Sequence, residues 1–173
     1  MSSMFYDCLN ITYLNISGFE TENVSNISKM FNNCTSLLSL NIEEIDTKNV
    51  KDMSLLFYKC KKISTINIIN FTTEKVINMN LMFYKCMNLI NLTFNPINFT
   101  AKAAVNSKYM FAGCSALKSI SFTNFDGSNL IYVEHMFEGC TNLESITLSG
   151  LNVTKIVYSH KMFFSCKRLK SLK

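Results

Sequence analysis

The amino-acid sequence predicts one α/β solenoid of about seven 26-residue turns, and three observations lead to this fold class. Seven cysteines recur at spacings of 26, 26, 26, 28, 26 and 26 residues: Cys8, Cys34, Cys60, Cys86, Cys114, Cys140 and Cys166. A Met or Leu followed by Phe stands four and three positions before each cysteine. An alternating apolar segment follows each cysteine. A unit this small cannot bury its own apolar face, so the units must stack.

The segment after each cysteine predicts a short β-strand. Leu40 and Ile42 alternate with polar neighbours, and Ile66 and Ile68 repeat the pattern one unit later. Alternation directs the apolar side chains inward and the polar ones outward. Most strands are followed by one more inward apolar residue, which in the sixth unit is Leu151. We expect the strands of successive turns to form a parallel sheet on one face of the solenoid.

The segment before each cysteine predicts a short α-helix on the opposite face. Val50, Met53, Phe57 and Cys60 recur at steps of three and four residues, as on one face of a helix. Three threonines lie just ahead of such segments and are suitable N-caps: Thr21, Thr47 and Thr73. The fourth unit departs from the pattern, with a two-residue insertion around Pro96 and with Ala104 and Ser107 in place of Val and Met.

The motif L-x-x-L-x-L after each cysteine resembles the strand segment of a leucine-rich repeat. The segment N-V-S-N-I-S-K-M-F-N-N-C-T-S-L, residues 23–37, resembles the BspA-like leucine-rich repeats of bacterial and protist surface proteins. It is also similar to a repeat domain of unknown function in mycoplasma surface lipoproteins. The resemblance runs through the whole chain. It implies a right-handed leucine-rich-repeat solenoid over residues 1–173 as a single domain. No polar cap is visible at either end, so we expect either a segment of a longer repeat array or ends that stack against something else.

The cysteines and histidines do not predict a metal, cofactor or catalytic site. Stacked cysteines direct their Cβ atoms in parallel, which favours buried free thiols over disulfides. No C-x-x-C motif occurs, so the usual zinc spacing is missing. His135 and His160 are expected close together at the surface, with Glu134 and Glu138 nearby, and a metal site there is the less favoured alternative. No nucleophile–base set or phosphate loop is visible, so we do not expect an enzyme.

The charge distribution is mildly basic and does not predict nucleic-acid binding. The chain has 17 Lys and Arg residues against 12 Asp and Glu, and Arg168 is the single arginine. One basic cluster contains Lys59, Lys61, Lys62 and Lys85, and a second lies at the carboxy end. We expect both clusters to be solvated, with weak affinity for acidic glycans or anionic lipid surfaces as the alternative.

The outward residues of the strands form the candidate binding surface. They are small, polar and uncharged in most turns: Tyr13, Ser39, Asn41, Thr65, Asn67, Asn91, Thr93, Ser119, Ser121, Ser145 and Thr147. Such residues suit a plain solvent-exposed sheet, and they equally suit a flat docking surface, which is how solenoids commonly use this face.

The functional prediction follows from this face and from the family resemblance. We expect a module that binds a protein or glycan ligand through the strand face of a surface or adhesion protein. The resemblance implies a cell-surface or extracellular location, although no signal peptide is visible, and any membrane attachment would come from regions beyond this sequence. The alternative is a structural component that associates end to end through its uncapped solenoid ends.

Overall fold

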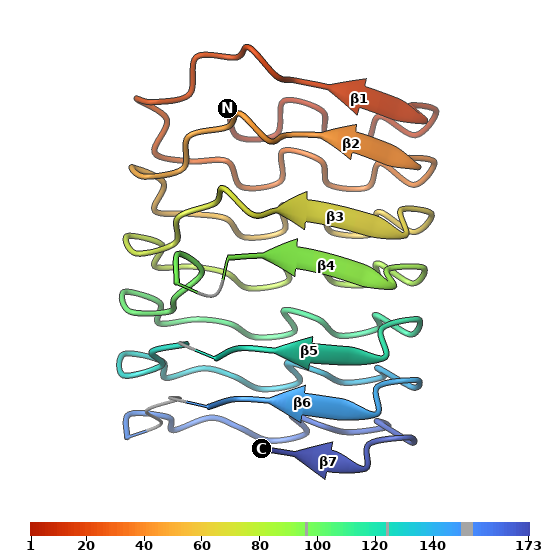
Figure 1. The fold of residues 1–173 in the computed structure, drawn as a ribbon, viewed down its shortest axis with the longest axis vertical. Coiled ribbons are helices and arrows are strands. Elements are labelled where there is room, and N and C mark those ends of the chain that lie inside the picture. Colours follow the sequence, from red (N-terminus) through yellow and green to blue (C-terminus); the bar gives the residue numbers. More distant parts are fainter. Residues whose placement is uncertain (96, 124, 150–153) are drawn as a thin grey trace.

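The computed structural model describes residues 1–95, 97–123, 125–149 and 154–173 as one stack of coils (Figure 1). The coils make about six turns. The short strands lie on one side of the stack and point the same way (Figure 1). They are β1 (Tyr13–Asn15), β2 (Ser39–Asn41), β3 (Thr65–Ile68), β4 (Asn91–Phe94), β5 (Ser119–Ser121), β6 (Ser145–Thr147) and β7 (Ser171–Leu172). The predicted Leu151 and Pro96 lie outside the described residues.

The strands pair in parallel with equivalent residues opposite each other. Tyr13 of β1 pairs with Ser39 of β2, and Ser119 of β5 pairs with Ser145 of β6. The strands form three separate sheets, in the orders β1-β2, β3-β4 and β5-β6-β7. The single sheet expected from the sequence is therefore interrupted after β2 and after β4.

The predicted fold class α/β, with short helices on the second face, is wrong. No helix occurs among the described residues, and the structure is a β-solenoid. The segment before each cysteine is a run of turns with a positive φ at two positions, one directly before the cysteine and one five residues before it. In the second unit these are Asn33 (φ 61°) and Lys29 (φ 58°). A right-handed helix requires negative φ throughout, so a positive φ every four residues excludes it.

The hydrogen bonds of this segment explain why a turn run replaces the helix. Along this segment, one N–H group donates a hydrogen bond within its own turn and the following one donates to the neighbouring turn. Met30 N–H donates to the Ile27 carbonyl at 3.2 Å, a local β-turn bond, while Phe31 N–H donates to the Leu56 carbonyl of the next turn at 3.0 Å. Every second peptide thus binds the neighbouring coil, which an α-helix cannot do because its N–H groups are used internally.

A ladder of phenylalanine rings fills the core between the two faces. Phe57 stacks on Phe31 with ring centroids 5.5 Å apart and on Phe83 at 5.4 Å. The ladder continues to both ends of the stack through Phe5, Phe111, Phe137 and Phe163. Stacked rings bury large apolar areas and hold each coil in the same register as the last.

The cysteines form a second ladder beside the rings. The five central thiols, from Cys34 to Cys140, are fully buried. Each Sγ donates to a phenylalanine carbonyl of the preceding coil, for example Cys60 to Phe31 and Cys86 to Phe57, both at 3.1 Å. The expected ladder of buried thiols is thus found in these five turns, and each thiol also links two coils.

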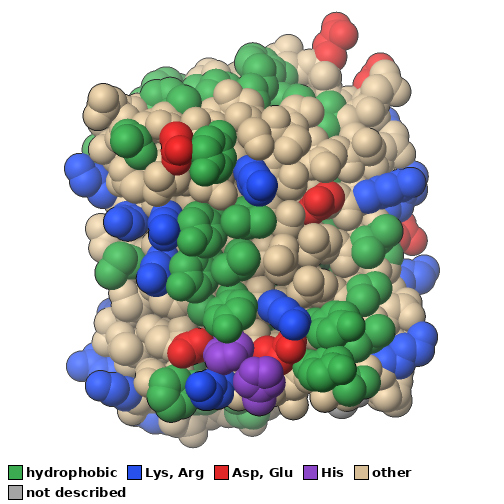
Figure 2. Space-filling model, turned by 180° about the vertical axis from the view of Figure 1, so that it is seen from behind, with side chains coloured by type: hydrophobic (Ala, Val, Ile, Leu, Met, Phe, Trp, Pro, Cys, Tyr) green, Lys and Arg blue, Asp and Glu red, His purple; other side chains and the backbone are tan. Residues whose placement is uncertain are grey.

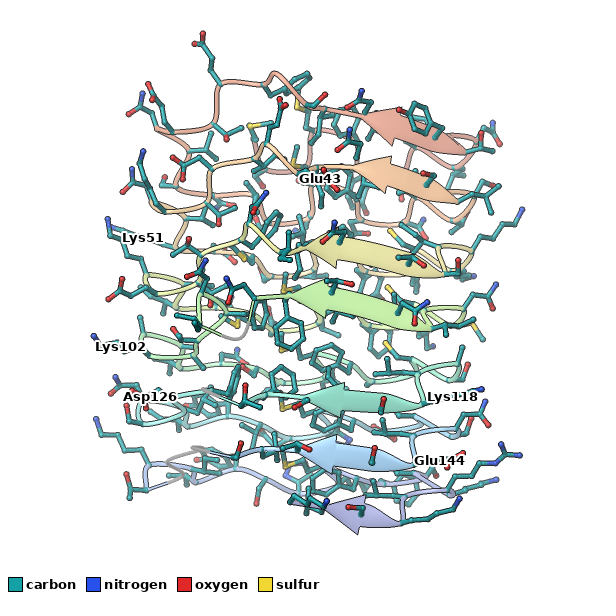
Figure 3. All side chains as sticks on the ribbon, in the orientation of Figure 1. Glu43, Lys51, Lys102, Lys118, Asp126 and Glu144 are labelled. Atoms are coloured by element: carbon teal, nitrogen blue, oxygen red, sulfur yellow. The ribbon has the colours of Figure 1, made fainter. Side chains whose placement is uncertain are left out.

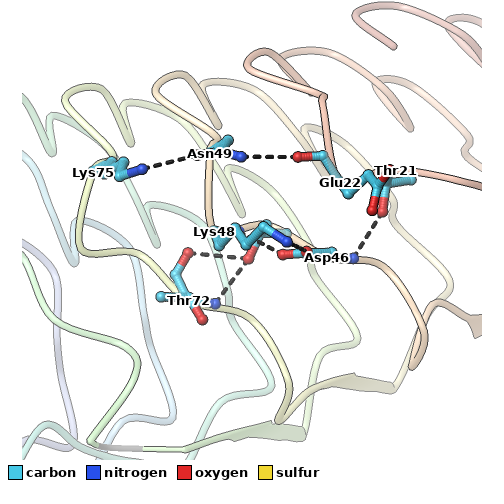
Figure 4. A network of polar contacts seen from close by, with 8 residues as sticks. Thr21, Glu22, Asp46, Lys48, Asn49, Thr72 and Lys75 are labelled. Atoms are coloured by element: carbon cyan, nitrogen blue, oxygen red, sulfur yellow. Dashed lines mark hydrogen bonds and ion pairs between the residues drawn. The ribbon is translucent and has the colours of Figure 1, made fainter.

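The threonines predicted as helix N-caps instead join neighbouring coils at the corner opposite the cysteines (Figure 4). Thr21 Oγ1 accepts a hydrogen bond from Asp46 N–H at 2.7 Å. Thr47 Oγ1 accepts from Thr72 N–H at 2.8 Å and donates to the Thr72 carbonyl at 3.0 Å. The N-cap prediction is wrong because no helix begins there. The side-chain hydroxyls satisfy backbone groups of the next turn instead.

Candidate binding surfaces

The strand face carries all of the side chains that the sequence assigned to binding. Register pairing aligns them in two columns along the stack, one at the first position of each strand and one two residues later. The first column is exposed through most of its length, as at Ser39, Thr65 and Ser119. No charged residue belongs to either column of the described strands. Figure 3 shows these short side chains projecting from the strands.

The asparagines of the second column have a structural role that the sequence did not reveal. Asn41 Oδ1 accepts from Glu43 N–H at 3.3 Å, and Asn67 Oδ1 accepts from Ile69 N–H at 3.2 Å. Each closes an Asx-turn at the end of its strand. Asn67 Nδ2 is occupied as well, because it donates to Glu43 at 3.0 Å. These amides are thus less available to a ligand than their exposure suggests.

The second column changes from Asn to Thr and Ser in the later turns. Thr93, Ser121 and Thr147 stand at this position in β4, β5 and β6. Their hydroxyl groups have no hydrogen-bond partner within the described chain, and Thr93 and Ser121 are exposed. Within the second column of the described strands, unpartnered hydroxyls therefore begin at β4 and replace the asparagines of β1 to β3.

These hydroxyls surround a hollow where β4 and β5 fail to pair. The hollow has a volume of about 590 Å³ and is lined by Leu92, Thr93, Phe94, Ser119, Ile120, Ser121, Thr123, Ser145 and Thr147. Five of these residues were assigned to binding from the sequence. The volume lies within the range of roughly 300–1,000 Å³ that is usual for ligand clefts.

Two features distinguish the chain beside this hollow. Phe94 and Phe122 stand where β3 carries Ile68, and their rings stack with centroids 5.4 Å apart. The two-residue insertion follows directly after β4. Leu92 and Phe94 are only partly buried here, whereas their counterparts Ile66 and Ile68 are buried. The hollow thus combines a polar rim with an apolar floor.

The histidine pair lies on the opposite face, as Figure 2 shows. The His135 and His160 ring centroids are 4.9 Å apart in an edge-to-face arrangement. His135 stacks on Tyr109 at 4.4 Å, and its Nδ1 lies 2.6 Å from Glu138 Oε2. The side chain of His135 is only 12% exposed, so it is a packed residue more than a surface one. Within the described ranges, no three His, Cys, Asp or Glu residues are arranged to hold a metal ion.

Comparison with known proteins places the chain in a family. A family model described as "Mycoplasma protein of unknown function, DUF285" matches residues 1–121 and 92–172. Among curated proteins no match is found. No helix of the described residues is long and apolar enough to cross a membrane.

Two solved structures resemble the chain at low identity. The crystal structure of a leucine rich cell surface protein from Faecalibacterium prausnitzii A2-165 is 15% identical with a TM-score of 0.37, over 99% of this chain and 75% of that one. A leucine-rich repeat protein from Bacteroides ovatus ATCC 8483 is 19% identical with a TM-score of 0.42, over 99% of this chain and 57% of that one. Neither similarity is high enough to assign a function.

The matched ranges together cover residues 1–172. The resemblance drawn from the sequence is confirmed. The chain belongs to the family described as Mycoplasma protein of unknown function, DUF285.

Proposed function

We propose that the chain is a binding module of a surface protein, and that it holds a protein or glycan ligand against its strand face. The observation that carries the proposal is the hollow between β4 and β5. There Thr93, Ser121 and Thr147 offer unpartnered hydroxyls above the apolar side chains of Leu92 and Ile120. A few convergent polar groups over an apolar floor are the usual composition of a ligand cleft.

The chemistry of the hollow favours an uncharged, hydrogen-bonding ligand surface. Serine and threonine hydroxyls both donate and accept, so they can pair with sugar hydroxyls or with the amides of a polypeptide. The lining residues include no Asp, Glu, Lys or Arg, so binding does not depend on charge pairs. We therefore expect the affinity of this face to depend only weakly on salt, because screening acts on charges.

Capture from animal-cell surface extracts tests the proposal. The immobilised wild type is compared with the Ser39→Lys/Ser119→Lys variant, which adds two ammonium groups to the strand face. We expect a protein or glycan to be retained by the wild type and lost by the variant, because a lysine directed at the ligand must be desolvated without a partner. Equal retention by both proteins would contradict the proposal. Self-association alone would favour the alternative of end-to-end assembly.

A matched control comes from the repeat itself. Asn23 and Ser25 are exposed and lie away from the strands, and the next turns carry Lys75 and Lys51 at the same two phases of the repeat. The Asn23→Lys/Ser25→Lys variant therefore adds the same charge at sites where the fold already accepts lysine. It should retain the ligand as the wild type does. Loss of the ligand by this control would mean that net charge, and not the strand face, governs binding.

A further inference from the structure

A second hollow lies at the corner of the solenoid that follows the cysteines, away from the strand face. It has a volume of about 430 Å³ and is lined by Lys59, Lys61, Lys85, Met87, Gly113, Ser115 and Gly139. Three lysines from adjacent turns thus surround one depression. In the view from behind, Lys and Arg side chains gather along one edge beside a column of hydrophobic side chains (Figure 2).

Two glycines open this hollow. The position directly before the cysteine is Asn33, Lys59 and Lys85 in turns two to four, and it becomes Gly113 and Gly139 in the next two turns. All five residues have positive φ, from 55° at Lys85 to 75° at Gly113. Since the other turns hold this φ with a side chain, the backbone alone does not require glycine. At Gly113 a Cβ would lie 3.0 Å from Lys85 Cγ, so the lysine stem occupies the space that a side chain would need.

The three ammonium groups are not neutralised. Among the described residues, none of Lys59, Lys61 and Lys85 has a carboxylate within 4.0 Å. The Lys59 Nζ lies 4.9 Å from the Tyr58 ring centroid and the Lys85 Nζ lies 5.1 Å from that of Tyr84. Cation–π contacts of this kind favour one position of a lysine without cancelling its charge.

One carboxylate lies beside the hollow but is already engaged. Glu138 lines a neighbouring depression together with Lys85, Gly113 and Gly139. Its Oε2 lies 2.6 Å from His135 Nδ1. The rim of the lysine hollow itself carries no acidic side chain. The site therefore presents concentrated positive potential to solvent.

The same edge carries further cations along the stack. Lys167 and Arg168 directly follow Cys166, at the phases of Lys61 and Lys62 four turns earlier. Lys118 lies on a turn between these two groups and is labelled at this edge in Figure 3. The turns between the two groups carry Met87, Ser115 and Thr141 at the phase of Lys61, and Glu144 is labelled at the same edge beside Lys118 (Figure 3). The two groups of cations are therefore separate and lie roughly 19 Å apart, at about 4.8 Å per turn. A linear ligand with several negative groups can span both.

We propose that this edge binds a linear sulfated polysaccharide, with one sulfated sugar seated in the hollow of Lys59, Lys61 and Lys85. Nucleic acid fits less well, because a single-stranded chain needs free aromatic faces, and Tyr58 and Tyr84 stack on each other at 5.1 Å. A bilayer fits less well, because the lysines rim a concave hollow, and a membrane surface is met by a flat or convex face. The proposal is independent of the ligand of the strand face.

Heparin binding at physiological salt, measured by calorimetry on the whole chain, tests the proposal. The variant Lys59→Gln/Lys61→Gln/Lys85→Gln is compared with Lys51→Gln/Lys75→Gln/Lys102→Gln, in which Lys51 and Lys102 lie at the opposite edge (Figure 3). Both variants lose three charges. We expect the first to bind heparin about tenfold more weakly and the second to change by less than about twofold, because only the first loses direct ion pairs.

A third variant tests the hollow without changing the charge. Gly139→Asn fills the depression with a residue that the fold holds at the equivalent Asn33, where φ is 61°. We expect it to weaken heparin binding severalfold, with an unchanged circular-dichroism spectrum and an unfolding midpoint lowered by at most about 4 °C, the cost of a side chain at positive φ. Equal weakening by the two lysine variants, or unchanged binding by Gly139→Asn, would overturn the proposal. So would tighter binding to single-stranded DNA or to phosphatidylserine–phosphatidylcholine vesicles than to heparin.

Discussion

At the scale of single residues, the cysteines are structural donors as well as apolar fillers. The phenylalanine carbonyls of the ladder from Phe5 to Phe137 each accept two hydrogen bonds. The Phe31 carbonyl, for example, accepts from Cys34 N–H at 3.2 Å and from the Cys60 thiol at 3.1 Å. Alanine or valine would fill the same space and leave part of this bonding unmade. One contact that suits a small buried donor thus explains the recurrence of cysteine from Cys34 to Cys166.

Burial makes these thiols very weak acids, which predicts a pH dependence of stability. Desolvation raises the pKa of Cys114 to about 12, and burial also raises the pKa of Cys60, Cys86 and Cys140 above the usual value of 9.0. A folded-state pKa above the unfolded one gives stability that is complete below about pH 9 and is lost as the pH rises toward the folded pKa. Above pH 9 only the unfolded chain releases these protons, so the free energy of unfolding should fall.

Urea unfolding under reducing conditions between about pH 8 and about pH 10.5 measures this fall. Each buried thiol contributes roughly 1.4 kcal/mol per pH unit once the pH exceeds its unfolded pKa. The Cys86→Ala variant removes one such group. Its free energy of unfolding should decline less steeply than that of the wild type by about that amount, while lysine and tyrosine ionisation affects both proteins alike. Identical slopes would show that Cys86 is not buried as a neutral thiol.

At the scale of elements, the segment before each cysteine is where the sequence misled. Val50, Met53, Phe57 and Cys60 all face the core, as a helical period requires. A run of turns with a left-handed residue every fourth position produces the same spacing of inward side chains. Most of the left-handed positions carry Lys, Leu, Tyr or Ser, which do not signal positive φ. Residue types that favour it occur only at scattered positions: Asp7, Asn33, Gly113, His135 and Gly139. Periodicity therefore located the inward side chains correctly and could not distinguish the two backbones.

Glycine substitution distinguishes the turn run from a helix. Lys29 is exposed with φ 58°, and Lys51 is exposed without positive φ. Lys29→Gly should leave the free energy of unfolding unchanged or raise it by up to about 1 kcal/mol, because glycine relieves the left-handed strain. Lys51→Gly should lower it by about 0.5–1 kcal/mol. Urea unfolding of the two variants makes the comparison. If Lys29→Gly instead lowered the free energy of unfolding by about 1 kcal/mol, as glycine does in a helix, the result would contradict a run of turns at this segment.

At the scale of the whole molecule, one register decides which side chains share the strand face. The spacing of 26 residues was enough to predict that Ser39, Thr65 and Ser119 share an exposed column. The hollow could not be predicted, because the spacing of the repeat does not show between which neighbouring strands the pairing is interrupted. Nor could the Asx-turns of Asn41 and Asn67, since their amides could equally have remained free. The strand face could thus be predicted from the sequence, whereas the hollow in it could be located only from the three-dimensional structure.

Site-specific photo-crosslinking on intact host cells locates the surface through which the protein binds. A photoreactive phenylalanine analogue is placed at Ser39 or Ser119 on the strand face, or at exposed Ser25 away from the strands. A crosslink reports contact within the reach of one side chain, so it locates the bound surface. If the ligand binds the strand face, we expect a discrete adduct from Ser119 and from Ser39 and none from Ser25. Adducts from Ser25 alone or equally from all three sites, or no adduct from either strand-face site, would contradict it.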